Sequence, residues 1–208
     1  EGTESGQAAE ETIADDSEQI EKEYDATKST FTSDIAGILQ DAADGGVSKA
    51  SFSARMRSSI NTYGKAAYLD GLQSGGVETD TLEGDDSDTF AGLLASQSSY
   101  VSDIASRLYN ADETLIANAD YNASLWANKT LTPFYQAGVI SADKSGMYEW
   151  KYGDTEHCDD CLRLNGQKHR MKDWMAKDWL PQGDNLECKG FNCQCQLIKT
   201  TGKAKGSY

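Results

Sequence analysis

Apolar residues recur along the first two thirds of the chain at steps of three and four, the spacing of one face of an α-helix. Glycine readily adopts the left-handed conformation that commonly ends a helix, so the turn Asp44-Gly45-Gly46 marks a helix end. One long helix is therefore predicted before this turn, and its apolar face comprises Ile13, Ile20, Tyr24, Phe31, Ile35, Ile38 and Leu39.

Two further helices are predicted from the same spacing. The second follows Ser48, a favourable N-cap residue, closes at Gly75-Gly76, and carries Phe52, Met56, Ile60, Tyr63 and Ala67. The third has Asp86 or Ser87 as its N-cap and, if unbroken, is predicted to run to about residue 128, and Pro133 is expected to end or bend it. Its apolar face comprises Phe90, Leu94, Val101, Ile104, Leu108, Ala111, Leu115 and Trp126.

These patterns divide the chain. Residues 1–10 are polar and are expected to form a frayed acidic tail, and residues 11–140 are expected to form an elongated hairpin or bundle of long antiparallel helices. Residues 145–200 are expected to form a separate small module, and residues 201–208 a flexible tail.

The small module should contain strands, so that the fold as a whole is mainly α with a small α+β module. In "MYEWKYG", residues 147–153, the alternation of residue types is typical of a strand. A second short strand is predicted at "QLIKT", residues 196–200.

The charge of the chain changes at the same boundary. Residues 1–149 hold 26 acidic and nine basic side chains, a net charge of −17, whereas residues 150–208 have a net charge of +2. Phosphate binding needs an excess of Lys and Arg, so direct nucleic-acid binding by the acidic part is not expected. No run approaches the roughly 18 apolar residues of a membrane-spanning helix, so no membrane partner is expected either.

All five cysteines lie in the last 51 residues. Cys158 and Cys161 form a Cys-x-x-Cys pair, and a 26-residue interval separates them from Cys188, Cys193 and Cys195. Two close groups of cysteines separated by a loop suit tetrahedral zinc, because each group offers two thiolates and the loop closes over the metal. We therefore predict one structural zinc ion bound by Cys158, Cys161 and two of the other three.

Other uses of these cysteines stay open. Two disulfides and one free thiol are possible, although the odd count disfavours them. A redox dithiol of Cys158 and Cys161 would need a helix start in a βαβ setting, which the pattern does not show. The sequence contains no Ser/His/Asp set, phosphate-binding loop or dinucleotide-binding glycine motif. His157 is expected to lie at the surface or to contact the ligands, and not to be a metal ligand itself. We therefore expect a protein that is not an enzyme.

The cysteine region also resembles a known signature. "YEWKYGDTEHCDDCLRLNGQ" and "DWMAKDWLPQGDNLECKGFNCQCQL" are similar to the C-terminal region of the phage Mu F-like head-morphogenesis, or minor head, proteins. Relatives often carry a His shortly before the final Cys-x-Cys, where this chain has Cys188. The resemblance covers about 50 residues and rests on Trp150, Cys158, Cys161, Leu164, Asn165-Gly166, Pro181, Cys193 and Cys195.

The resemblance implies a minor virion structural protein that takes part in head morphogenesis and possibly in genome delivery. Its implied partners are the portal protein, the major capsid protein and further copies of itself. Its implied location is the capsid interior or portal region, after assembly in the host cytoplasm. The alternative is a cellular zinc-ribbon adaptor that binds a protein partner through its helices, and a weaker one is a thiol oxidoreductase.

Overall fold

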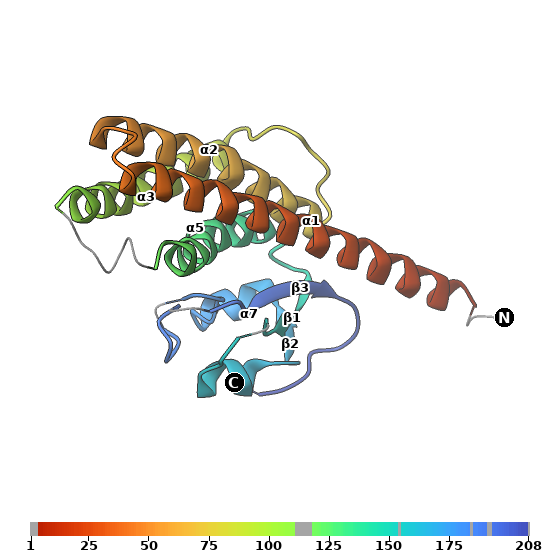
Figure 1. Cartoon of the computed structure of the whole chain (residues 1–208). Helices are drawn as coiled ribbons and strands as arrows, with labels where there is room; N and C mark the ends of the chain where they lie inside the picture. Colours follow the sequence, from red (N-terminus) through yellow and green to blue (C-terminus); the bar gives the residue numbers. More distant parts are fainter. Residues whose placement is uncertain (1–3, 111–117, 154, 184, 191–192, 208) are drawn as a thin grey trace.

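The computed structural model describes residues 4–110, 118–153, 155–183, 185–190 and 193–207. Long helices pack side by side into a bundle, and a small three-stranded sheet with short helices lies against one side of it (Figure 1). The predicted fold class, mainly α with a small C-terminal α+β module, is confirmed. The long helices are α1 (Glu4–Ala43), α2 (Lys49–Ser74), α3 (Asp85–Tyr109) and α5 (Ala119–Ala142).

The ends of the first two helices follow the predicted signals. α1 begins at Glu4, inside the segment expected to be frayed, and ends just before the glycine turn, where Gly45 has a φ of 71°. Ser48 is the N-cap of α2, and its hydroxyl accepts a hydrogen bond from the backbone N–H of Ser51 at 3.2 Å. This bond satisfies one of the backbone donors that every helix start leaves unpaired.

The prediction of one unbroken third helix was wrong. α3 ends at Tyr109, and a separate helix, α5, runs from Ala119 through Pro133 to Ala142. Proline removes the donor for the Lys129 carbonyl. Both residues line a cleft, and the helix nevertheless continues through Pro133 to Ala142.

Most of the predicted apolar faces form one core. α2 lies among the other three long helices and packs against each of them. Tyr63, Phe90, Leu94, Ile104 and Trp126 are only partly buried, and Ile13, Ala111 and Leu115 lie outside the side chains that the structure describes. The fully or nearly fully buried positions include Tyr24, Phe31, Ile35, Ile38, Leu39, Phe52, Met56, Ile60, Ala67, Val101 and Leu108.

The contact between α2 and α5 depends on two glycines. A Cβ atom on Gly138 would overlap the backbone carbonyl oxygen of Tyr68, and one on Gly71 would overlap that of Tyr135. The two backbones therefore lie so close together that neither position has space for a side chain. This contact fixes α5, the helix on which the C-terminal module rests.

The module is built around an antiparallel sheet with the strand order β2-β1-β3. β1 (Met147–Lys151) and β3 (Gln196–Thr200) confirm the two strands predicted from the sequence, whereas β2 (Lys168–Arg170) was not predicted. Two short helices complete it, α6 (Asp159–Leu164) and α7 (Met171–Ala176).

Two tryptophans form the centre of the module's own small core. Trp150 and Trp174 are fully buried, with ring centroids 5.7 Å apart. The indole N–H of Trp174 donates to the backbone carbonyl of Tyr148 at 3.2 Å, which fixes α7 against β1. Beyond β3, Lys205 pairs through its backbone with Lys168 and so holds part of the C-terminal segment against β2.

Polar contacts attach the module to the bundle. Lys199 on β3 donates to the backbone carbonyl of Gly75 at the end of α2 and forms an ion pair with Asp143 at 3.4 Å. Asp143 also accepts hydrogen bonds from the backbone N–H groups of Ser145 and Gly146, in the turn that leads into β1. None of the described helices is long and apolar enough to span a membrane.

We predict that Gly138→Ala lowers the free energy of unfolding by about 1–3 kcal/mol, because the new methyl group has no space against α2. The matched control is Gly37→Ala on α1, where a Cβ would meet no atom within 4 Å. This control should be neutral or stabilising by up to about 1 kcal/mol, since alanine favours helix. Urea unfolding of both variants measures the difference, and equal stabilities would contradict the close contact.

Candidate metal centre

The structure brings all five cysteines together from three segments. Cys158 and Cys161 lie at the start of α6, Cys188 lies in the loop after α7, and Cys193 and Cys195 directly precede β3. The sheet brings these segments together, because β1 leads to α6 and pairs with β3. The pairing therefore places the first cysteine group beside the last.

The thiols form two overlapping triads. The sulfur atoms of Cys158, Cys161 and Cys188 all lie within 4.8 Å of one another, and so do those of Cys161, Cys193 and Cys195. Cys161 belongs to both triads. It is buried, like Cys193 and Cys195, whereas Cys158 and Cys188 are partly exposed. A cluster of five thiols of this size could bind a metal ion.

Cys158 lies where a helix start favours a negative sulfur. It is the N-cap residue of α6, and its Sγ accepts a hydrogen bond from the backbone N–H of Cys161 at 3.5 Å. The backbone N–H of Cys188 also bonds to this sulfur. Burial opposes ionisation, but the two N–H groups and the neighbouring thiols together lower the pKa of Cys158.

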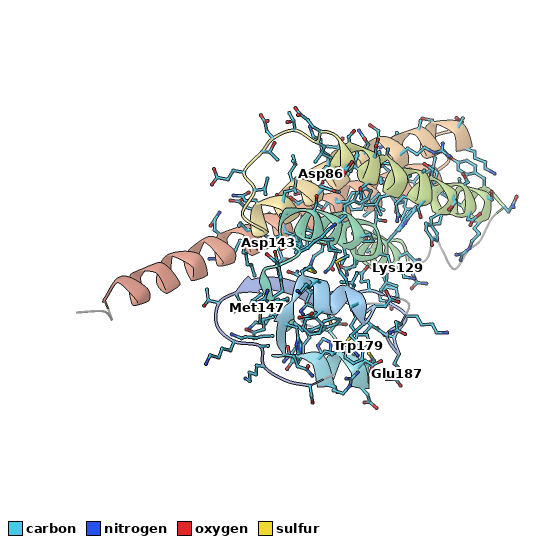
Figure 2. All side chains as sticks on the ribbon, turned by 180° about the vertical axis from the view of Figure 1, so that it is seen from behind. Asp86, Lys129, Asp143, Met147, Trp179 and Glu187 are labelled. Atoms are coloured by element: carbon cyan, nitrogen blue, oxygen red, sulfur yellow. The ribbon has the colours of Figure 1, made fainter. Side chains whose placement is uncertain are left out.

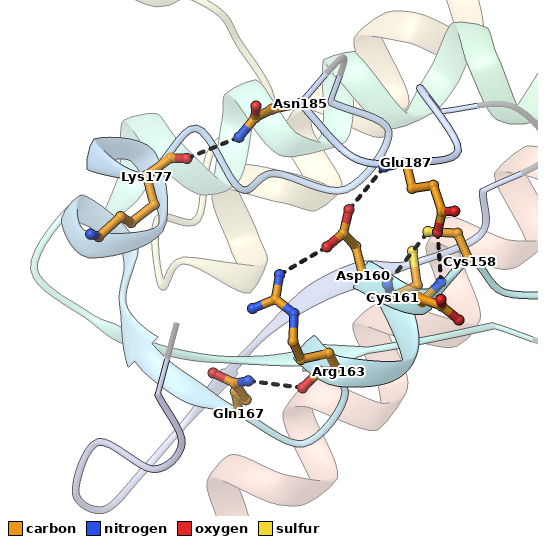
Figure 3. Close-up of polar contacts among 9 residues, drawn as sticks. Cys158, Asp160, Cys161, Arg163, Gln167, Lys177, Asn185 and Glu187 are labelled. Atoms are coloured by element: carbon orange, nitrogen blue, oxygen red, sulfur yellow. Dashed lines mark hydrogen bonds and ion pairs between the residues drawn. The ribbon is translucent and has the colours of Figure 1, made fainter.

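A pair of acidic side chains ties α6 to the loop that carries Cys188 (Figure 3). Asp160 accepts a hydrogen bond from the backbone N–H of Glu187 at 2.9 Å, and the Glu187 carboxylate accepts one from the N–H of Asp159 at 3.0 Å. Arg163 forms an ion pair with Asp160 at 2.9 Å. These contacts hold the two sides of the first triad in place independently of the sulfur atoms.

The loop after Cys188 folds back tightly. Lys189 and Gly190 have φ angles of 47° and 71°, a conformation that other residues resist more than glycine does. The turn directs the backbone N–H of Gly190 at the Cys188 sulfur, although burial still raises the pKa of this thiol to about 11. A Cβ atom on Gly190 would overlap the carbonyl oxygen of Gln182, so the loop passes close to its own beginning.

Cys193 and Cys195 have different surroundings. The neighbouring thiols of Cys161 and Cys195 and the backbone N–H groups of Cys195 and Gln182 stabilise a negative charge on Cys193 and strongly lower its pKa. Cys195 contacts the thiols of Cys161 and Cys193 and the indole N–H of Trp150, and the negative charge of Cys193 and burial raise its pKa to about 12.

The five thiols cannot all ionise without a cation. The pKa of Cys161 is raised because its thiol donates to Cys193 and Cys195 and because their charges and its burial disfavour a second negative charge nearby. A bound metal cation reverses this preference, since it stabilises every thiolate that it contacts. The donor set therefore fits a soft or borderline metal ion.

The two histidines lie apart from this donor set. The His157 ring stacks on Tyr152, with centroids 4.2 Å apart, and His169 is buried against the edge of Trp174 at 4.7 Å. Among the described residues, neither belongs to a group that could hold a metal. The candidate centre therefore offers sulfur ligands alone.

Gln182 is the functional residue that the sequence reading missed. It has a φ of 63°, and its side-chain Nε2 donates to the carbonyl of Asn128, the hydroxyl of Thr132 and the carbonyl of Cys193, at 2.8–3.0 Å. One amide group thus joins α5 to the cysteine segment. The neighbouring Pro181 and Gly183 indicate a turn, but no local signal identifies the long-range partners.

Comparison with known proteins gives no relative. No family model, no curated protein and no solved structure matches this chain. The resemblance to minor head proteins therefore rests on the residues of the cysteine region alone.

We predict that Gln182→Ala loosens the cysteine module from the bundle, because the carbonyls of Asn128 and Cys193 lose their shared donor. The cost should be about 1–3 kcal/mol, as for other buried groups left without a partner. Hydrogen exchange should accelerate in β3 more than in α2. Asn185→Ala is the matched control, since this exposed amide makes one hydrogen bond at 3.3 Å, and it should change exchange little.

Proposed function

We propose that the cluster binds one structural zinc ion through Cys158, Cys161, Cys188 and Cys193. Zinc takes four ligands at the corners of a tetrahedron and accepts four thiolates. Sulfur atoms bound at about 2.3 Å lie roughly 3.8 Å apart. The sulfurs of Cys158, Cys161 and Cys188 already lie within 4.8 Å of one another, and that of Cys193 lies within 4.8 Å of Cys161. Four sulfur ligands leave no position for a reactive water, which supports a role in folding rather than catalysis.

The choice of Cys193 over Cys195 rests on their hydrogen bonds. Backbone N–H groups point at the sulfurs of Cys158, Cys188 and Cys193, and such donors stabilise thiolates. Cys193 also interacts electrostatically with Cys188 and so connects the second triad to the first. Cys195 instead has a raised pKa, because its thiol donates to Cys193 and lies buried beside the negative charge of that residue.

We predict one zinc ion per purified chain, measured by elemental analysis. Serine at any of the four proposed ligands should weaken zinc binding on the order of a hundredfold, because each ligand supplies about a quarter of a large binding free energy. Cys195→Ser should keep one ion per chain and an unchanged sulfur-to-cobalt absorption after cobalt substitution.

Two outcomes contradict this assignment. Loss of the metal in Cys195→Ser, but not in Cys193→Ser, would show that Cys195, and not Cys193, is the fourth ligand. Absence of metal together with disulfides that join Cys158 and Cys161 to the distal cysteines, found by mass spectrometry, would replace zinc by disulfide bonds.

We further propose that the chain is a minor virion structural protein of a tailed phage, docked near the portal or the inner capsid surface. The cysteine signature carries this proposal. The architecture supports it: a rigid helical bundle offers long surfaces for docking and self-association, and the module stabilises one side of it. The proposal includes no catalytic role. A cellular zinc-ribbon adaptor is the alternative, because the same architecture suits any scaffold.

The position of Cys158 gives specific support to a second candidate, a thiol oxidoreductase. The Cys-x-x-Cys pair begins a helix after all, and the partly exposed Cys158 has a lowered pKa, which is the usual arrangement of an attacking thiol. Such an enzyme should turn over a small disulfide substrate and lose that activity in Cys161→Ser. A structural zinc site should show no turnover, either in the unchanged chain or in Cys161→Ser.

Localisation tests the virion proposal. Antibodies against the chain should detect it in purified procapsids or mature particles of the phage that encodes it, bound to the portal or the inner shell after gentle disruption. A capsid-free cell extract is the control. Absence of the chain from both kinds of particle would refute the proposal and leave the cellular adaptor.

A further inference from the structure

A cleft of about 250 Å³ lies where the cysteine module meets the bundle. One wall comes from α3, a second from α5, and a third from the loop that carries Cys188. Figure 2 shows Lys129 on the side of α5 that faces the module, at the edge of this junction. The cleft thus brings together three segments that are distant in the sequence.

Two aromatic side chains line the cleft. Tyr100 on α3 is 55% exposed, and Trp126 on α5 is partly buried against the core. Tyrosine and tryptophan are the residues most enriched at the centres of protein interfaces, because each offers a large apolar surface with one polar atom.

Two amide side chains that line the cleft have unused hydrogen-bonding groups. Gln97 is 8% exposed, and its Oε1 accepts a hydrogen bond from Thr130 at 3.3 Å. Among the described residues, no acceptor is recorded for its Nε2. Gln182 uses its Nε2 for three bonds, while its buried Oε1 has no partner in the same part of the chain. A peptide backbone supplies both a donor and an acceptor for such amides.

Two lysines give the cleft a positive charge. Lys129 and Lys189 are exposed, and among the described residues neither takes part in an ion pair. The chain as a whole carries a net charge of −15, so two uncompensated lysines on one cleft are a local reversal of its charge. A carboxylate between them would relieve their mutual repulsion.

We propose that this cleft binds an acidic peptide segment of a protein partner. One aromatic side chain inserts beside Tyr100 and Trp126, and a neighbouring carboxylate pairs with Lys129 and Lys189. The size favours a peptide, because sites for free small molecules usually have volumes of about 300–1,000 Å³ and enclose most of the ligand. The residues that line the cleft suffice for this binding, whether or not the chain is a virion protein.

The cysteine cluster would control this site. Lys189 follows Cys188 directly, and the Gln182 side chain is bonded to the Cys193 carbonyl, so the cysteines hold the third wall of the cleft. The walls from α3 and α5 belong to the bundle and do not depend on the cluster. Removing a metal from the cluster should therefore weaken peptide binding without unfolding the bundle.

A random peptide library displayed on phage, selected against the immobilised full chain, tests the proposal. Selected sequences should combine an aromatic residue with Asp or Glu nearby. Labelled selected peptides are then measured by fluorescence anisotropy at low salt. Lys129→Glu and Lys189→Glu should each weaken binding at least about fivefold, the effect of one lost and reversed charge pair at a partly exposed site.

Lys65→Glu is the matched control, because this exposed lysine of α2 lies outside the cleft and should leave binding unchanged. Trp126→Ala, checked for folding by circular dichroism, should weaken binding at least about tenfold if the ring is an anchor. Selection without enrichment would overturn the proposal. So would peptides that bind both lysine variants as tightly as the unchanged chain.

Discussion

The C-terminal module depends on the enclosure of five thiols in one small space. Three segments approach one another at these sulfur atoms: the helix start at Cys158, the turn after Cys188 and the segment before β3. The sulfur of Cys161 belongs to both triads. Neighbouring thiolates repel each other, so this packing is stable only if most thiols stay neutral or a cation balances them. Backbone N–H groups near Cys158, Cys188 and Cys193 stabilise thiolates, so the cluster is a donor set that could bind a metal ion.

The module is attached to the bundle through a few polar contacts. Gln182 joins the cysteine segment to α5, and Lys199 joins β3 to the end of α2. α5 in turn is fixed by the close approach of Gly138 to α2. The position of the cleft therefore follows from a chain of constraints that begins at the cysteines and ends in the helical core.

Local rules predicted the parts of the structure that local interactions determine. The apolar faces of α1 and α2, the Ser48 cap and the strands β1 and β3 follow from spacing and cap residues that act over a few positions. The break after Tyr109 was missed because the apolar spacing continues across it, and Pro133 does not end α5, which continues to Ala142. β2 was missed because three residues carry too little pattern.

In the candidate site, too, the sequence predicted the features that depend on local spacing and missed those that depend on long-range contacts. Sequence spacing identified the five cysteines, and it left open which of the last three bind a metal, because that choice depends on backbone donors placed by the fold. Gln182 and the Asp160–Glu187 contacts join segments that are more than ten residues apart, so no local pattern reports them. The helical bundle buries a continuous apolar seam and holds itself together. The module has a smaller core around Trp150 and Trp174, and strand pairing together with the Asp160–Glu187 contacts brings its cysteine segments together.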